Sequence, residues 1–165
     1  MKPKEFVKKH IEFARETERK TGISAVYVLA QAALETGWGQ HAPGNMYFGV
    51  KAKHGTPVNR KQLIRTREVM NHPHAEFPVV LSITKRADGK YDYVVKDWFM
   101  KYDTPEESFT AHAELLLNVP RYRKALAVKH NPYAYADAIA AAGYATDPQY
   151  ATTLKKIIRM IEQYV

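Results

Sequence analysis

The stretch that decides the fold and points to the function runs from Gln31 to Gly39 and reads QAALETGWG. It continues an apolar segment with helical spacing, and Gly37 and Gly39 end that helix. Glu35 is therefore a lone carboxyl group among Ala, Leu and Trp at a helix end. Because such surroundings partly desolvate a carboxylate, they raise its pKa toward the range useful to a general acid. The plainer alternative is a Glu that faces solvent on an amphipathic helix.

The N-terminal third of the chain is predicted to be helical. Apolar residues at near-helical spacing indicate an amphipathic helix over about residues 4–20, with Gly22 as its stop. Ser24 is a suitable N-cap for the helix that carries Glu35. Residues 41–55 are predicted to form a loop rich in Gly and Pro. This loop also holds aromatic residues, and such loops usually line a site.

Residues 56–102 have a different composition, with many β-branched and aromatic side chains. Ala87-Asp88-Gly89-Lys90 is typical of a type I′ hairpin turn, which joins expected strands at about 79–85 and 91–99. Residues 58–70 have the same composition. We therefore predict a small antiparallel sheet of two or three strands inserted between helices.

Helical signals return after the sheet. Thr104-Pro105-Glu106-Glu107 is a capping box that opens a helix ending at Asn118. Three more helices are predicted, over about residues 121–129, from Asn131-Pro132 to Gly143, and from the cap Asp147-Pro148 onward. The fold class is thus α+β but mainly α, in a single domain over residues 1–165. Its helical lobe covers about 1–55 and 103–165, and its β lobe covers about 56–102.

Composition limits the classes of partner. The 165-residue chain carries a formal net charge of +8, eleven Tyr and no Cys, which excludes disulfide scaffolds and thiolate metal sites. The positive charge indicates attraction to a polyanion, namely nucleic acid, an anionic membrane or bacterial wall polymers. No apolar run reaches about 18 residues, and the N-terminus lacks the apolar core of a signal peptide.

Two acids and one Tyr remain once packing is accounted for. Glycoside hydrolysis needs one carboxyl group to protonate the leaving oxygen and commonly a second carboxylate. Glu35 in a helical lobe and Glu68 in a β lobe would supply these from two sides of a cleft, with Tyr144 in a later turn. Alternatively, Glu68 simply pairs with Arg65 or Arg67. Other acids of the β lobe are possible substitutes for Glu68, namely Glu76, Asp92 and Asp97.

At these residues the chain closely resembles the glucosaminidase family of peptidoglycan hydrolases, glycoside hydrolase family 73. Family members look like Ala-Gln-Ala-x-Leu-Glu-(Ser/Thr)-Gly-Trp-Gly followed by Asn-Asn-Leu-Phe-Gly-Ile-Lys, and here these stand as 30–39 and 45–51. The family's Thr-x-Glu, Phe-x-x-Tyr-Asp and Tyr-Ala-Thr-Asp-Pro-x-Tyr segments resemble 66–68, 99–103 and 144–150. Two departures are Met46 in place of the second Asn, and Val69 where an aromatic often follows the β-lobe Glu.

The resemblance implies a lysozyme-like plan, in which the helical lobe and the β lobe enclose a cleft. By it Glu35 is the general acid, Glu68 the β-lobe carboxylate and Tyr144 a residue that orients substrate or water. It also implies substrate-binding positions, namely Trp38, Asn45, Tyr47, Phe48, Tyr102 and Asp147. Some of these have structural alternatives: Trp38 could belong to the core, Tyr144 could be ordinary packing, and Asp147 could be only an N-cap.

The predicted function is an endo-β-N-acetylglucosaminidase acting on peptidoglycan glycan strands. A muramidase or lytic transglycosylase is the nearest rival, and a non-catalytic wall-binding or polyanion-binding module is the alternative from another class. We expect a monomer that needs no cofactor, binds no nucleic acid and inserts into no membrane. No metal site is expected, since His72 and His74 lack a third ligand at a recognisable spacing. Action on the wall without a signal peptide implies phage-type release or a trimmed exported protein.

Overall fold

The first two helices begin and end where their capping residues predict. In the computed structural model, which describes residues 1–165, α1 covers Pro3–Thr21 and α2 covers Ala25–Thr36. Gly22 ends α1 in the left-handed conformation at φ 76°, and its N–H donates to the Glu18 carbonyl over 2.7 Å. The Ser24 hydroxyl accepts a hydrogen bond from the Tyr27 N–H at the start of α2. The predicted bounds of both helices are confirmed.

The helices after the sheet follow the predicted order, with two differences. The Thr104 hydroxyl caps α3 by accepting from the Glu107 N–H over 3.3 Å, and Asn131 caps α4. The predicted helix at 121–129 is a 3₁₀ helix, η3. The N-cap of α5 is Gln149, so the prediction that Asp147 caps this helix is wrong by two residues. The bounds are α3 Pro105–Asn118, η3 Pro120–Val128, α4 Pro132–Ala141 and α5 Tyr150–Glu162.

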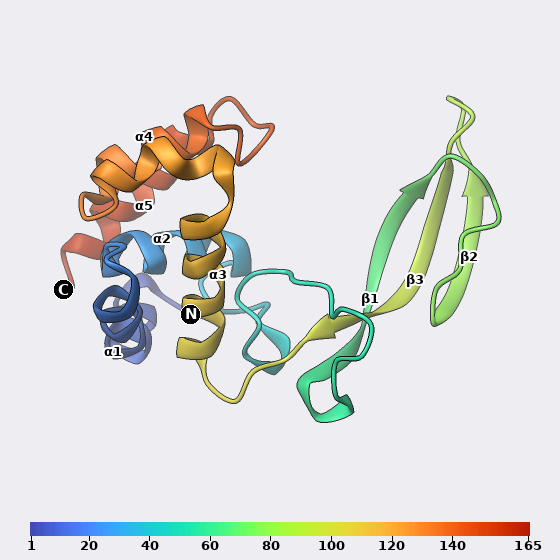
Figure 1. Ribbon diagram of the computed structural model, residues 1–165, viewed down its shortest axis with the longest axis horizontal. Helices are drawn as coiled ribbons and strands as arrows, with labels where there is room; N and C mark the ends of the chain where they lie inside the picture. The colour runs from blue at the N-terminus through green and yellow to red at the C-terminus, as the bar shows by residue number, and fades with distance from the viewer. The chain divides into compact units, whose positions relative to one another are not determined.

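All five α-helices belong to one unit of the chain, formed by residues 1–48 and 102–165, which we call the helical unit. Its centre is α2, which packs against α1, α3, α4 and α5 (Figure 1). Alanines on α2 are fully buried and allow this close approach on several sides. Large side chains fill the remaining core, among them Phe6, Tyr27, Phe109, Tyr135, Leu154 and Ile158. No helix of the chain is both long and apolar enough to cross a membrane.

Residues 49–101 form a second unit, the β unit, built on a three-stranded antiparallel sheet. Its strands are β1 Lys61–Met70, β2 Val79–Lys85 and β3 Tyr91–Met100, and the order is β1-β3-β2, with β3 in the middle (Figure 1). Short 3₁₀ segments occur before the sheet, η1 at Pro43–Asn45 in the helical unit and η2 at Val58–Arg60 in the β unit. The predicted mainly helical α+β architecture is confirmed.

The hairpin turn between β2 and β3 is not of the predicted type. A type I′ turn needs a positive φ at both central residues, and in this turn only Gly89 has one, at 85°. The Gly89 N–H donates to the Arg86 carbonyl, and the Arg86 N–H donates to the Lys90 carbonyl over 2.7 Å. This is the pattern of a type I turn followed by a left-handed Gly, which forms a bulge. The strands themselves lie within one residue of the predicted bounds.

The β unit buries few side chains. Tyr93 and Val95 on β3 are fully buried, whereas every residue of β2 is exposed. The Tyr93 hydroxyl donates to the His72 carbonyl and accepts from the Ala75 N–H, each over 3.1 Å, which fixes the connection between β1 and β2. The interpretation of residues 1–165 as one functional domain stays a prediction.

Candidate active site

Glu35 lies in the last turn of α2, one residue before the helix ends at Thr36. Its side chain is open to solvent on one side and forms no ion pair or hydrogen bond with another residue. Protein on the other side desolvates the carboxyl group and raises the pKa of Glu35, as the sequence predicted. A partner-free carboxyl with a raised pKa is suited to donate a proton.

The turn after Glu35 is held in an unusual backbone conformation. Gly37, Trp38 and Gly39 all have positive φ, of 58°, 59° and 84°, and for Trp38 this is costly. Two hydrogen bonds hold the turn: the Trp38 N–H donates to the Ala33 carbonyl, and the Gly39 N–H donates to the Thr36 hydroxyl, each over 2.8 Å. The half-buried Trp38 ring meets Phe6 edge-on at 5.6 Å, so it rests on the core while keeping one part accessible.

Tyr144 follows α4, and the charge of Glu35 contributes to raising the pKa of both Tyr144 and Tyr150, so the carboxyl lies within electrostatic reach of the two phenols. Burial is the larger cause for each, and it keeps both phenols protonated. The Tyr144 hydroxyl lies 3.2 Å from His112 Nε2 on α3, and its ring is 5.4 Å from that of Tyr150. Tyr144 is thus part of a buried polar cluster as well as a neighbour of the acid.

Two of the predicted substrate-binding aromatics belong to the core. Tyr47 is 5% exposed and its hydroxyl is hydrogen-bonded to His10 Nε2 over 2.6 Å. Phe48 is 4% exposed and stacks on His112 with ring centres 3.8 Å apart. Because neither ring offers surface to a glycan, their assignment to substrate binding is corrected to a packing role. The aromatic loop residues were predicted to line a site, and they line the core behind it.

Asn45 and Tyr102 tie the loop after α2 to the segment before α3. The Asn45 side-chain N–H donates to the Tyr102 carbonyl over 3.1 Å, and the Tyr102 N–H donates to the Gly44 carbonyl over 2.8 Å. Asn45 has a positive φ of 56°, a conformation that Asn tolerates better than most residues. Asp147 is exposed, and its carboxylate accepts from the Gln149 N–H over 2.8 Å to form a turn before α5.

Glu68 is the third residue from the end of β1, opposite Tyr93 on β3. Its expected partners were Arg65 or Arg67, but it pairs with Lys51 over 2.6 Å. Lys51 also reaches Asp97 on β3 over 3.2 Å, so one ammonium group holds two carboxylates. Burial is partial, with the Glu68 and Asp97 side chains 25% and 19% exposed.

The other acids and histidines considered in the sequence all lie in the β unit. Asp92 pairs with Arg67 and Arg86, and Glu76 is exposed on the connection between β1 and β2. The His72 and His74 rings stack 6.1 Å apart, and no group of three His, Asp or Glu side chains in the chain is arranged to hold a metal ion.

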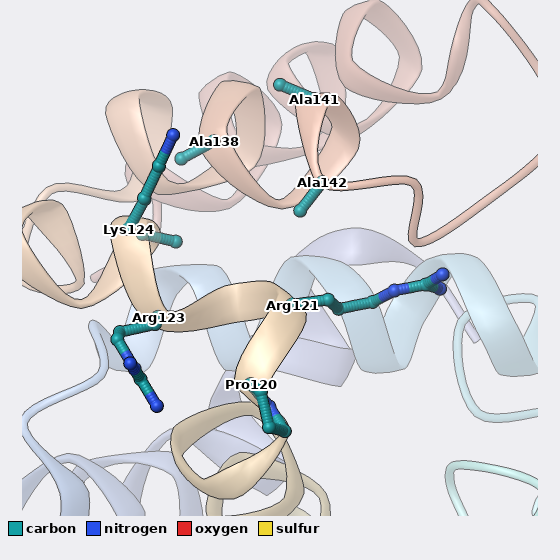
Figure 2. A pocket seen from close by; sticks show the side chains of 8 residues that line it. Pro120, Arg121, Arg123, Lys124, Ala138, Ala141 and Ala142 are labelled. Atoms are coloured by element: carbon teal, nitrogen blue, oxygen red, sulfur yellow. The ribbon is translucent and has the colours of Figure 1, made fainter.

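A separate hollow of about 640 Å³ lies between η3 and α4. Arg121, Arg123 and Lys124 line it together with alanines of α4, and none of the three is in an ion pair. Figure 2 shows that the three cationic side chains point away from one another. They therefore add to the basic surface but do not converge on one anion.

The comparisons with known proteins decide the family. The sequence model of the glucosaminidase family, described as mannosyl-glycoprotein endo-beta-N-acetylglucosaminidase, matches residues 11–163. The chain belongs to the glucosaminidase family. This confirms the resemblance seen in the motifs.

Relatives of this glucosaminidase include the peptidoglycan hydrolase FlgJ of Vibrio cholerae, 35% identical over 96% of the chain and 43% of that protein. FlgJ of Pseudomonas aeruginosa is 29% identical over 97% of the chain and 37% of that protein. Among solved structures, a C-terminally truncated glycoside hydrolase domain from Salmonella typhimurium FlgJ matches with a TM-score of 0.72 and 29% identity, over 98% of this chain and 99% of that one. The chain thus spans less than half the length of these curated relatives but nearly all of the solved hydrolase domain.

Proposed function

We propose that this glucosaminidase is an endo-β-N-acetylglucosaminidase that cleaves the β-1,4 bond on the reducing side of N-acetylglucosamine in bacterial peptidoglycan. Family membership supports the reaction class, and the names of the FlgJ relatives support the polymer. The observation that carries the proposal is Glu35, a partner-free carboxyl with a raised pKa at the end of the central helix. Such a group holds the proton that the leaving oxygen must receive.

Each proposed site residue has a distinct role. Glu35 is the general acid, Glu68 is the carboxylate of the β unit, and Tyr144 orients the substrate or water by hydrogen bonding. Trp38 offers a ring face to a sugar, while Asn45 and Tyr102 hold the neighbouring loop. Asp147 keeps a proposed contact with substrate, because its carboxylate is exposed.

The stereochemistry of the product tells what Glu68 does. If Glu68 activates a water, the anomeric configuration inverts; if Glu68 or the substrate's own acetamide attacks the sugar, the configuration is retained. NMR of the freshly formed reducing end distinguishes inversion from both retaining routes.

Zymography on purified cell wall tests the assignment of Glu35. Glu35→Gln keeps the shape of the side chain but removes its acidity, so we expect no clearing at enzyme amounts where wild type clears fully. Glu12→Gln on α1 is the matched control, since it removes an exposed carboxylate that pairs only with Arg15. Full clearing by Glu35→Gln would sink the proposal.

Mass spectrometry of the released fragments separates this reaction from its nearest rival. Reducing ends that carry N-acetylglucosamine are expected. Reducing ends of N-acetylmuramic acid or of its anhydro form would identify a muramidase or a lytic transglycosylase instead. Binding to wall without any bond cleavage would identify a non-catalytic module.

The proposed setting is the bacterial cell wall, where the chain acts as a single monomeric domain on glycan strands. A net charge of +8 suits anionic wall polymers, so wall lysis should decline as salt is raised from about 0.05 M to 0.5 M and the Debye length shortens. Lysis that does not change with salt would show that charge attraction does not contribute to action on the wall.

A further inference from the structure

Four polar side chains from separate segments of the helical unit meet in its core, and one of them, Gln31, precedes Glu35 on α2 by one helical turn. Gln31 on α2 donates through Nε2 to the Tyr150 hydroxyl of α5 over 3.2 Å, and its Oε1 lies 3.1 Å from His112 Nε2 on α3. The same His112 Nε2 lies 3.2 Å from the Tyr144 hydroxyl. Gln31 is 1% exposed and His112 is 9% exposed, so the cluster is built into the core.

The position of one proton sets the direction of every hydrogen bond in this cluster. Burial lowers the pKa of His112 to about 4, so near neutral pH its ring carries a single N–H. Nδ1 has no hydrogen-bond partner in the protein, whereas Nε2 faces two oxygen atoms. A proton on Nδ1 would set the Nε2 lone pair against that of Gln31 Oε1. With the Gln31 amide in this orientation, the favoured tautomer carries the N–H on Nε2.

With this tautomer, the hydroxyl oxygens of both tyrosines act as hydrogen-bond acceptors. The single His112 Nε2–H is shared between Gln31 Oε1 and the Tyr144 oxygen, and the Tyr150 oxygen accepts from Gln31 Nε2–H. Neither phenol donates its own O–H to a protein acceptor, and Glu35 is close enough to contribute to the pKa of both. Stacking of Phe48 on His112, at 9° between the ring planes, holds the imidazole in this orientation.

We propose that His112 and Gln31 are positioning residues, which do not contact the substrate themselves. They orient the Tyr144 hydroxyl so that its O–H donates a hydrogen bond into the site beside Glu35. The positioning role rests on the proposed function in one respect, namely that Tyr144 contacts substrate or water. Its hydrogen-bond direction is a property of the free protein and can be tested without substrate.

The first test is spectroscopic. Long-range ¹H–¹⁵N NMR of the wild-type chain, labelled at histidine, measures which ring nitrogen carries the proton. We expect His112 as the Nε2–H tautomer, unchanged from pH 8 down to pH 5.5. An Nδ1–H tautomer, or titration of His112 within this range, would overturn the proposal. Because the experiment uses wild-type protein, it distinguishes the two tautomers even if a His112 variant does not fold.

The second test is a double-mutant cycle in wall hydrolysis. His112→Met fills similar space without a donor, and we expect kcat to fall by on the order of tenfold while KM changes little. In a Tyr144→Phe background the same change should cost less than about twofold, because the oxygen that His112 orients is gone. Thr110→Val is the control: it removes a buried hydrogen bond to Thr17 from the same helix and should not show this coupling.

The outcomes separate the two proposals. Equal losses from His112→Met in both backgrounds would mean that His112 does not act through Tyr144 and would overturn this inference. If Tyr144→Phe alone keeps wild-type kcat, then the role of Tyr144 in the proposed function fails, and the NMR result still decides the direction of the hydrogen bond.

Discussion

The two proposed carboxylates lie in units of opposite character. Glu35 lies in the last turn of the well-buried helix α2 and has no partner, so desolvation raises its pKa. Glu68 lies in a thin sheet and shares Lys51 with Asp97. Desolvation of an acid without a charged partner favours its protonated form, as at Glu35. We therefore propose Glu35 as the proton donor and keep Glu68 as the proposed carboxylate of the β unit.

The largest expected effect compares the two carboxylates directly. Glu35→Gln should lower kcat by about 10²- to 10⁴-fold, the usual contribution of a general acid, and Glu68→Gln by about 10²-fold. Steady-state hydrolysis of soluble glycan fragments measures both. A Glu68→Gln enzyme with wild-type kcat would remove Glu68 and open the role to Asp97.

Stability should differ between the units as sharply as burial does. Phe109 is fully buried in the helical unit, so Phe109→Ala should cost about 3–5 kcal/mol of unfolding free energy. Ile83 on β2 is 44% exposed, and Ile83→Ala should cost about 0.5 kcal/mol or less. Urea denaturation followed by circular dichroism measures both variants. Similar losses would mean that β2 is covered in solution.

A smaller effect is expected at Lys51. Lys51→Met removes the ammonium group that holds Glu68 and Asp97, so two carboxylates lose their counter-ion. We expect kcat to fall about tenfold, because the two neighbouring carboxylates repel each other without the shared ammonium group. Lys53→Met, two residues away and without an ion pair, is the matched control. An unchanged kcat would show that Lys51 does not support Glu68.

The smallest effect concerns the stability that follows from the pKa of Glu35. A carboxyl whose pKa is raised by folding stabilises the fold below its unfolded pKa, and that contribution is lost as pH rises through the folded pKa. Glu35→Gln should therefore raise Tm at pH 7, by on the order of 1 °C, and leave it unchanged near pH 4. Calorimetry at the two pH values checks this. A lower Tm at pH 7 would mean that the ionised carboxylate has a stabilising partner.

Local signals predicted the frame of the molecule well. Gly22, Ser24, Thr104 and Asn131 mark helix ends because each satisfies backbone groups within a few residues of itself. The turn at Gly89 was predicted with the wrong type, since the sequence pattern fits both a type I′ turn and a type I turn with a bulge.

The site was only partly predictable, for a physical reason. The environment of Glu35 follows from its neighbours in sequence, so its raised pKa was predicted. Tyr47 and Phe48 could face the site or the core, and packing against His10 and His112 decided for the core. His112 itself was missed, although its position between Phe109 and Leu116 on an apolar helix face was a signal of burial.

Sequence patterns were enough to predict the helices, the strands, the family motifs and the acid near the end of α2, because these depend on contacts between near neighbours. Only the tertiary structure decided that Lys51, 17 residues before Glu68, is its partner, and that Gln31 meets His112 across 81 residues and Tyr150 across 119. Hydrogen-bond partners at such separations are set by how helices and strands pack. Side-chain periodicity shows which face of an element is apolar but not which faces contact one another.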